Sequence, residues 1–548
     1  MRKQFCLILL FIFPSVFAQD ELINIMKTEL DKNYKYLNVQ PIPAYYINYR
    51  IEDASSYQIS SSFGNLVASE FTQFRFLQIL VRVGNHAFDN SHKSNDNITY
   101  FYAPLPFENV EGVKKQLWFR TDVLYKNAIG EYSKLKGSVA AKGDNEDNSP
   151  DFSKEKPEKY IEKPVNWGSL NLNIKKWEDK IVMYGNVFND NKDIHTADVD
   201  LSIEVNTRYF VDSDGAEIVE NSLIYRITVN IHTIAEDGMR LSLFKSYNAS
   251  SLGDFPDDKK IQADMQEMNK TISALKKAPV ADSYTGPAIL SPLAAGVFFH
   301  EIFGHRIEGA RLKKDMDAQT FKKKIGESVL PEDFSVTFDP QAKEYKGIHL
   351  FGHYSFDDEG VKGQKVNVVE KGILKSFLMN RTPIDGFPNS NGHGRGQINR
   401  KTVTRQSNMF IESTSAKTDK ELRDLLIKEI KKQNKPYGYY FDQVEGGFTN
   451  TDRVNPNAFT VSPVIVYRVY ADGRPDELVR GVDLIGTPLS MFSQIRYGGK
   501  IYDVFNGYCG AESGVVPVST IAPALFVELI ETQKKPSGQI KQFIMERP

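Results

Sequence analysis

Cysteine is nearly missing from this chain of 548 residues. Only Cys6 and Cys509 occur, and Cys6 falls within an apolar N-terminal stretch that we predict to be removed. Cys509 therefore has no intramolecular disulfide partner, which excludes a disulfide framework. A lone thiol in an oxidising compartment is a liability unless it is buried, paired with another chain or bound to metal.

A basic surplus is missing as well. Lys and Arg number 68 against 70 Asp and Glu, so no excess charge is available to neutralise phosphates, and no nucleic-acid partner is expected. Internal repeats are not evident, and no apolar run beyond the N-terminus resembles a transmembrane segment. The composition is otherwise that of a globular protein, 41% hydrophobic and 25% charged, and the length predicts two large domains.

The N-terminus, "MRKQFCLILLFIFPSVFAQD", has the pattern of a secretory signal peptide. Two basic residues precede a short apolar stretch at 5–13, and "VFA" at 16–18 resembles a cleavage site. We expect residues 1–18 to be removed, so that the mature chain starts near Gln19. This pattern predicts an exported protein, periplasmic or secreted, with no integral membrane segment after cleavage.

The first half of the chain is predicted to be mainly sheet. Aromatic and β-branched residues, often in alternation, mark strands at 45–51, 74–84, 199–210 and 221–238. Residues 142–164 are so polar, charged and interrupted by proline that we expect a charged, exposed insertion there. Apolar residues with helical spacing at 261–275 predict an amphipathic helix that leads to a domain boundary near residue 280.

The second half has hairpin patterns at 365–380 and 463–486 and a further amphipathic helix at 419–433. The predicted fold is therefore α+β with two domains, residues 19–280 and 281–548. Each domain is expected to be dominated by antiparallel β-sheet with packed helices. The second contains the apolar stretch "PLAAGVFF", a helix candidate that leads directly into a histidine motif.

The motif "HEIFGH" at 300–305 sets two imidazoles five residues apart, with a carboxylate between them. A metal site is one explanation, because unpartnered ionisable groups after a buried segment are costly. The other is a core histidine with satisfied hydrogen bonds and a salt-bridged glutamate. On a regular α-helix residues i and i+5 lie ~140° apart, so a single ion could not easily bind both imidazoles. A helix end or wide turn at Gly304 would bring His305 back toward His300.

Several stretches together resemble the TldD/PmbA family of metallopeptidases. They are "ILSPLAAGVFFHEIFGHRIEG" (289–309), "DDEGVKGQKVNVVEKGILKSFLMNR" (357–381), "NGHGRG" (391–396) and "YCGAESGVVPVST" (508–520), and more faintly "FLQILVRVGNHAFDN" (76–90). The resemblance covers the second domain in order. It implies a metallopeptidase in which His300, His305 and Cys509 bind zinc and Glu301 acts in catalysis.

Cys509 suits that role chemically, because a catalytic zinc has three protein ligands and an open position for water. We expect its Sγ to lie near both imidazoles, with the ligand atoms roughly 3–4.5 Å apart around a tetrahedral ion. Glu301 would take a proton from water. The chain departs from the family pattern where Ala310 replaces a common acidic residue, and its signal peptide sets it apart from the cytoplasmic members.

The sequence favours an exported zinc metallopeptidase that acts on peptides or unfolded segments, held as an added strand at a sheet edge. Candidate substrate contacts lie in glycine-containing segments: His353, Asp358, His393 and Arg395; each histidine has a loop-ordering role as its alternative. A non-catalytic zinc-containing scaffold or partner subunit of a homologous peptidase is the alternative function. Amide hydrolysis in a non-peptide substrate is a third. The resemblance also implies a dimer, either a homodimer or a heterodimer with a family homologue.

Overall fold

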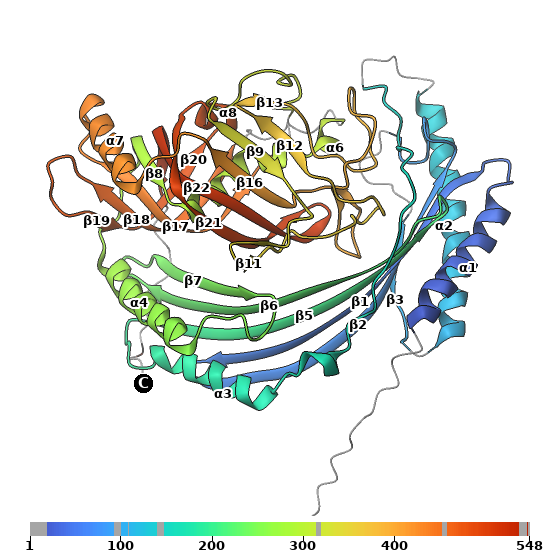
Figure 1. Cartoon of the computed structure of the whole chain (residues 1–548), viewed down its shortest axis with the longest axis horizontal. Helices are drawn as coiled ribbons and strands as arrows, with labels where there is room; N and C mark the ends of the chain where they lie inside the picture. Colours follow the sequence, from blue (N-terminus) through green and yellow to red (C-terminus); the bar gives the residue numbers. More distant parts are fainter. Residues whose placement is uncertain are drawn as a thin grey trace, which may run out of the picture.

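The computed structural model of the chain describes residues 19–92, 100–107, 109–139, 147–313, 319–451, 458–535 and 545. The expected signal peptide lies outside the described residues. Two layers are stacked in Figure 1: a long curved sheet from the first half of the chain, and a second sheet with its helices lying on the concave side of the first. The predicted α+β fold class is confirmed.

The first layer is a seven-stranded sheet in the order β3-β2-β1-β5-β6, in which β6 also pairs with β4 and β7. All neighbours are antiparallel except β4 and β6. The strands are β1 (Ala44–Ser62), β2 (Asn65–Val83), β3 (Tyr100–Pro104), β4 (Lys159–Ile161), β5 (Thr196–Asp212), β6 (Glu217–Ile234) and β7 (Arg240–Ala249). The four predicted strands are thus present, and several are longer than expected.

Four helices cover the outer face of this sheet (Figure 1). They are α1 (Gln19–Leu37), α2 (Val110–Val139), α3 (Ile174–Gly185) and α4 (Asp258–Lys277). Along β5 buried and half-buried residues alternate, because Val199, Leu201 and Ile203 pack in the core with α3 and α4. The opposite face of β5 carries Asn206 and Arg208, so a polar surface is presented to the second layer.

The expectation of an exposed insertion at 142–164 is wrong for part of its described residues. Phe152 is only 1% exposed and lies between the guanidinium groups of Arg82 and Arg381, each 4.0 Å from the ring centre. The Ser153 amide donates to the Arg381 carbonyl at 2.9 Å, and β4 extends the first sheet. Although the segment is highly charged, its Phe152 ring joins the two layers, which composition alone did not reveal.

The second layer contains an eleven-stranded sheet. Its strands are β8 (Tyr284–Leu290), β9 (Phe334–Phe338), β12 (Val366–Glu370), β13 (Ile373–Leu374), β16 (Asn408–Ser413), β17 (Gly438–Thr449), β18 (Phe459–Val469), β19 (Glu477–Val479), β20 (Val482–Gly486), β21 (Ile495–Ala511) and β22 (Gly514–Lys534). Two further pairs are β10 (Glu344–Tyr345) with β11 (Ile348–His349), and β14 (Gly394–Arg395) with β15 (Val403–Thr404). Most neighbours are antiparallel; β16 with β22 and β17 with β8 are parallel.

Five strands of this sheet close on themselves. β22 pairs with β8, β8 with β17, β17 with β18, β18 with β20, and β20 with β22. The helix α5 (Pro292–Ile302) packs against β17, β18, β21 and β22, and its apolar side chains belong to the largest buried core. The other helices are α6 (Gly309–Leu312), α7 (Asp419–Lys432) and α8 (Pro488–Phe492). The sheet thereby surrounds the helix that carries the histidine motif.

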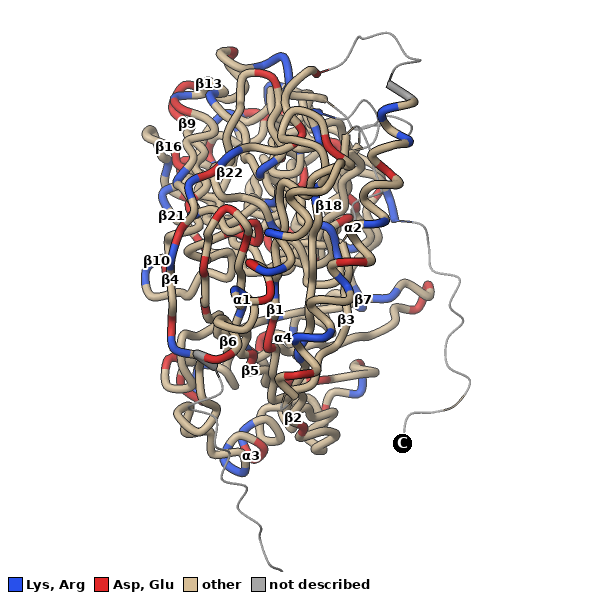
Figure 2. Tube along the Cα trace, turned by 90° about the vertical axis from the view of Figure 1, so that its right-hand side faces the viewer, with Lys and Arg blue, Asp and Glu red and all other residues tan. Residues whose placement is uncertain are grey.

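Charges of both signs are spread over this architecture. Figure 2 shows basic and acidic residues interspersed along both layers, in keeping with their near-equal numbers. Among the described helices, none is both long and apolar enough to cross a membrane.

Candidate metal centre

The helix α5 brings His300 and Glu301 into the interior. The Ser291 hydroxyl accepts from the Ala294 amide at 3.2 Å and caps the helix, while Pro292 occupies a first-turn position where no amide donor is needed. Every residue from 294 to 302 is buried, so the apolar stretch before the motif is a core helix. Its last turn then places two ionisable side chains where burial is costly unless they have a chemical partner.

The chain leaves the α-helical path immediately after Ile302. A short 3₁₀ helix follows from Gly304 to Arg306, and the ring centres of His300 and His305 come within 4.9 Å of each other. The predicted helix end that lets the two imidazoles converge is confirmed. Glycine is required at position 304 because the neighbouring space is filled. A Cβ there would lie 1.9 Å from Oε1 of Gln406, so any other side chain would displace that amide.

Cys509 completes the cluster from the far end of the sequence. Its Sγ lies 3.1 Å from Nε2 of His300 and 3.3 Å from Nε2 of His305, and one ligand atom of each residue lies within 4.8 Å of the others. The residue lies within β21, opposite Val516 of β22, and not in a turn. The hairpin turn comes just after it, and the strand packs against α5.

Protonation in this cluster favours a thiolate. Burial by itself raises the pKa of the Cys509 thiol, but the charges of the two imidazoles and their hydrogen bonds bring it well below its usual value. Burial also lowers the pKa of His305, whereas the charges of Cys509 and Glu308 raise it, and the outcome is about 10. A thiolate is the form of cysteine that binds metal, whereas a protonated imidazole cannot bind it, so a bound cation would take the place of the proton on His305.

Glu308, a carboxylate that sequence reasoning missed, contacts His305 on the ring nitrogen that faces away from the cluster. Oε2 of Glu308 lies 3.3 Å from Nδ1 of His305 and accepts from Nε of Arg311 at 2.7 Å. Burial raises its pKa, but the charges of His305 and Arg311 outweigh burial and lower the pKa to about 2. Such a carboxylate fixes the ring orientation and directs Nε2 toward the cluster. The i, i+3 spacing from His305 was a usable signal.

Arg405 holds the cysteine strand in the same network. It is fully buried, donates to the Cys509 carbonyl at 2.6 Å and to the Ser513 hydroxyl at 2.7 Å, and its Nε lies 3.7 Å from Oε1 of Glu308. The residue lies about a hundred positions from either histidine or cysteine, so no local pattern could have identified it.

Glu301 faces a cavity of about 510 Å³ that is also lined by His300, His305 and Cys509. Burial raises the pKa of this carboxylate, which brings it closer to the range useful for a general base. Gly447 of β17 lies directly against this side chain and leaves room for it: a Cβ on Gly447 would lie 2.4 Å from Cγ of Glu301. The metal cluster and a carboxylate therefore meet at one accessible space.

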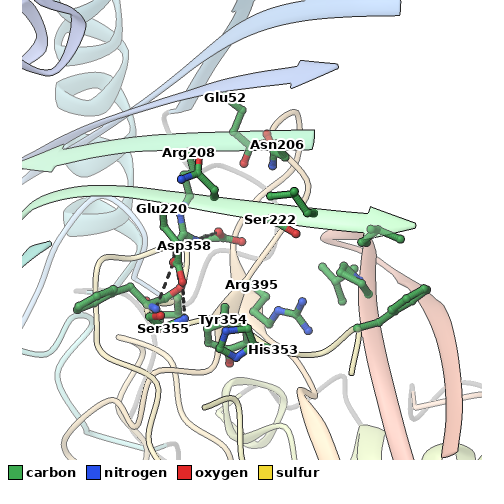
Figure 3. A pocket seen from close by; sticks show the side chains of 18 of the residues that line it. Glu52, Asn206, Arg208, Glu220, Ser222, His353, Tyr354, Ser355, Asp358 and Arg395 are labelled. Carbon is green, nitrogen blue, oxygen red and sulfur yellow. Dashed lines mark hydrogen bonds and ion pairs between the residues drawn. The ribbon is translucent and has the colours of Figure 1, made fainter. Parts of the chain in front are cut away.

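The four candidate substrate contacts do not join this cavity. His393 is fully buried, with Nδ1 2.9 Å from Oδ1 of Asn391 and Nε2 3.1 Å from Oγ of Ser407. Both its ring nitrogens are engaged, so the prediction that it contacts substrate is wrong. His353, Asp358 and Arg395 line a second cavity of about 540 Å³ between the layers (Figure 3).

Comparison with known proteins places this geometry in context. Residues 283–534 match the model of the PmbA/TldA metallopeptidase C-terminal domain. The chain belongs to the TldD/PmbA family. The matched residues include the whole cluster, from His300 to Cys509.

Relatives within the TldD/PmbA family carry metalloprotease names. A metalloprotease of Methanocaldococcus jannaschii is 29% identical over 316 residues, which cover 57% of this chain and 64% of that protein. A zinc metalloprotease TldD homolog of Saccharolobus solfataricus is 25% identical over 335 residues, or 60% of this chain and 69% of that protein. The similarity to the first of these thus spans less than two thirds of its length.

The fold is shared more widely than the sequence. The crystal structure of TldE from Thermococcus kodakarensis aligns with a TM-score of 0.61 at 15% identity, covering 94% of this chain and 100% of that one. Both layers therefore follow the architecture of a TldD/PmbA-type protein.

Proposed function

We propose that this chain is an exported, zinc-dependent metallopeptidase that hydrolyses peptides or unfolded segments. The observation that carries the proposal is the convergence of His300, His305 and Cys509 beside the Glu301 carboxylate in one cavity. The metalloprotease names of relatives support the same reaction class. The N-terminal pattern of a signal peptide supports export.

The residues present fit a zinc ion. Two imidazole nitrogens and one thiolate are the donor types that zinc prefers, and their number leaves an open position. The Sγ to Nε2 distances of 3.1 and 3.3 Å are those of atoms that can share one ion with bonds of about 2.0–2.3 Å. A zinc ion held there would supply Lewis-acid chemistry, polarising a carbonyl and making a water more acidic.

The chain's own residues would transfer the proton and position the metal ligands. The Glu301 carboxylate takes a proton from the attacking water and passes it to the leaving amine. Glu308 keeps His305 in the required orientation, and Arg405 holds the cysteine strand through the Cys509 carbonyl. The raised pKa of Glu301 makes it a stronger base toward water than an exposed glutamate.

A non-catalytic zinc scaffold, either alone or as partner subunit of a homologous peptidase, is the second candidate. The placement of Glu301 favours the enzyme, because a structural zinc site needs no carboxylate facing a cavity.

The test is hydrolysis of a mixed peptide library by the purified mature protein, with Glu301→Gln as the variant. We expect cleavage by the parent and a loss of about 10²-fold or more in the variant, the scale of a general base, with zinc retained. Glu412→Gln, the same change on an exposed residue of β16, is the control and should cleave like the parent. Zinc without cleavage in the parent would favour the scaffold.

A further inference from the structure

The metal cavity is the space of about 510 Å³ lined by His300, His305, Cys509 and Glu301. Parts of β17 and β21 line it from the second layer, and the first layer lines it with Arg226, Asn230 and Phe244. The Ser242 hydroxyl of β7 donates to Oε1 of Glu445 of β17 at 3.1 Å, so the two layers are in contact at this place. A substrate bound in this cavity therefore meets the first sheet as well as the metal cluster.

Three aromatic side chains line this cavity with much of their surface free. Phe448 of β17 is 71% exposed, Tyr508 of β21 is 40% exposed and Phe244 of β7 is 39% exposed. Large apolar side chains that remain exposed together in a concave space mark ligand-binding sites, because their contact with water is unfavourable. The three rings therefore indicate a ligand with an apolar group.

Two of these rings are next to the reacting groups in the chain. Tyr508 immediately precedes the proposed metal ligand Cys509. Phe448 immediately follows Gly447, the residue that lies against Glu301. Consecutive Cα atoms are about 3.8 Å apart, so both rings are mounted close to the place of reaction. A substrate side chain that reaches them belongs to a residue close to the bond being cleaved.

The third ring, Phe244, is joined to the second layer through Arg226. The guanidinium carbon of Arg226 lies 5.5 Å from the ring centre of Phe244 and 5.5 Å from that of Tyr508. A guanidinium is attracted to aromatic faces, so Arg226 holds a ring of the first layer near a ring of the second. The two rings form one part of the cavity wall, and Phe448 adds a ring from β17.

Apart from Glu301, the charged side chains of the lining are engaged elsewhere. Arg311 pairs with Glu308 at 2.7 Å and with Glu512 at 2.8 Å. Arg226 stacks on aromatic rings, and Glu445 accepts a hydrogen bond from a hydroxyl group of the first layer. The aromatic surface is therefore the part of the lining that a substrate side chain can cover.

We propose that Phe244, Tyr508 and Phe448 form a specificity subsite for a large apolar side chain of the peptide substrate, above all an aromatic one. The inference rests on the proposed peptidase function and names the class of substrate. Contact between aromatic rings is favourable beyond the area that it buries, so Phe fits this subsite better than Leu. Such side chains are mostly buried in folded proteins. The subsite thereby selects unfolded segments through residues that folding hides.

The test is cleavage by the parent of a peptide series that is blocked at both ends and differs at one central position: Phe, Leu, Ala, Glu or Lys. We expect kcat/KM for the Phe peptide to exceed that for the Ala peptide by about 10- to 100-fold, with Leu between them and Glu and Lys no better than Ala. The cleaved bond, identified by mass spectrometry, should lie beside the Phe. Equal kcat/KM for Phe and Ala would overturn the inference. So would a preference for Glu, which would assign recognition to the Arg226 guanidinium.

Binding without cleavage provides an independent readout. In Glu301→Gln, calorimetric titration should show the Phe peptide bound more tightly than the Ala peptide by a similar factor of about 10- to 100-fold. A parent that cleaves no peptide contradicts the peptidase proposal, whereas cleavage of the series without a preference for Phe contradicts this inference alone.

Phe244→Ser combined with Phe448→Ser should remove most of the preference for Phe. The matched control is Phe71→Ser combined with Phe74→Ser, which removes two exposed phenylalanines of β2 outside the cavity lining and should retain the preference. Because the readout is a ratio between two peptides on one sample, partial unfolding of a variant does not change it. A preference for Phe that survives the combined change at Phe244 and Phe448 would overturn the inference.

Discussion

Glu308→Gln removes the negative charge behind His305 while keeping the size of the side chain. Glu308 is fully buried and lies 3.3 Å from Nδ1 of His305, 2.7 Å from Nε of Arg311 and 3.7 Å from Nε of Arg405. A neutral amide can still contact the imidazole, but it no longer fixes the ring tautomer or raises the basicity of Nε2. It also leaves two guanidinium groups without their shared counter-charge.

Loss of such a carboxylate behind a metal-binding histidine typically costs about 10- to 100-fold in metal affinity. We therefore expect Glu308→Gln to bind zinc more weakly by that factor, measured by competition with a chromogenic chelator. Glu512→Gln is the matched control: it removes the other partner of Arg311, at 2.8 Å, without touching His305, so zinc affinity should change little. If Glu308→Gln bound zinc as tightly as the parent, the reasoning that Glu308 orients a ligand would be refuted.

Two further predictions concern residues around the centre. Gly447→Ala places a Cβ 2.4 Å from Cγ of Glu301, so kcat/KM should fall by roughly 10- to 100-fold at unchanged zinc content, and an unaltered kcat/KM would show that the carboxylate position is not critical. Burial holds the pKa of His393 at about 3 in the folded chain, below its ordinary 6.5, so its contribution to stability is present above pH 6.5 and is lost as the pH falls toward 3. His393→Asn should therefore flatten the pH dependence of the urea-unfolding free energy between pH 6 and 4 by about 1.4 kcal/mol per unit, and equal slopes would contradict a neutral buried ring.

The elements with a clear periodicity were predictable from sequence. The helical stripe at 261–275 became α4, and the pattern at 419–433 became α7 with a Thr418–Glu421 capping box. The polar half of β1, from Glu52 to Ser62, was not predicted, because it has few β-branched or aromatic residues. Pairing with β2 on one side and β5 on the other makes it a strand. Long-range pairing of this kind leaves no local signal.

The residues of the candidate site also fall into two groups, those identified from local sequence and those that depend on tertiary packing. The histidines and Glu301 were identified from a short motif, and Cys509 from a resemblance supported by the chemistry of zinc. Glu308 could have been identified in the same way, because it follows a metal-binding candidate by three residues. Arg405 could not have been identified from the sequence, because its role depends on tertiary packing that brings β21 against the end of α5. His393 was misjudged, since a glycine-rich segment can equally be a fully buried loop.

The central claim is that Cys509 is the third ligand of a catalytic zinc. The most direct measurement is the zinc content of the purified parent and of Cys509→Ser, determined by plasma mass spectrometry alongside hydrolysis of the peptide library. Because a neutral hydroxyl is a poor zinc ligand, we predict a single bound zinc in the parent and joint loss of zinc and hydrolysis in Cys509→Ser. A Cys509→Ser protein that binds zinc as tightly as the parent and still cleaves peptides would contradict the account.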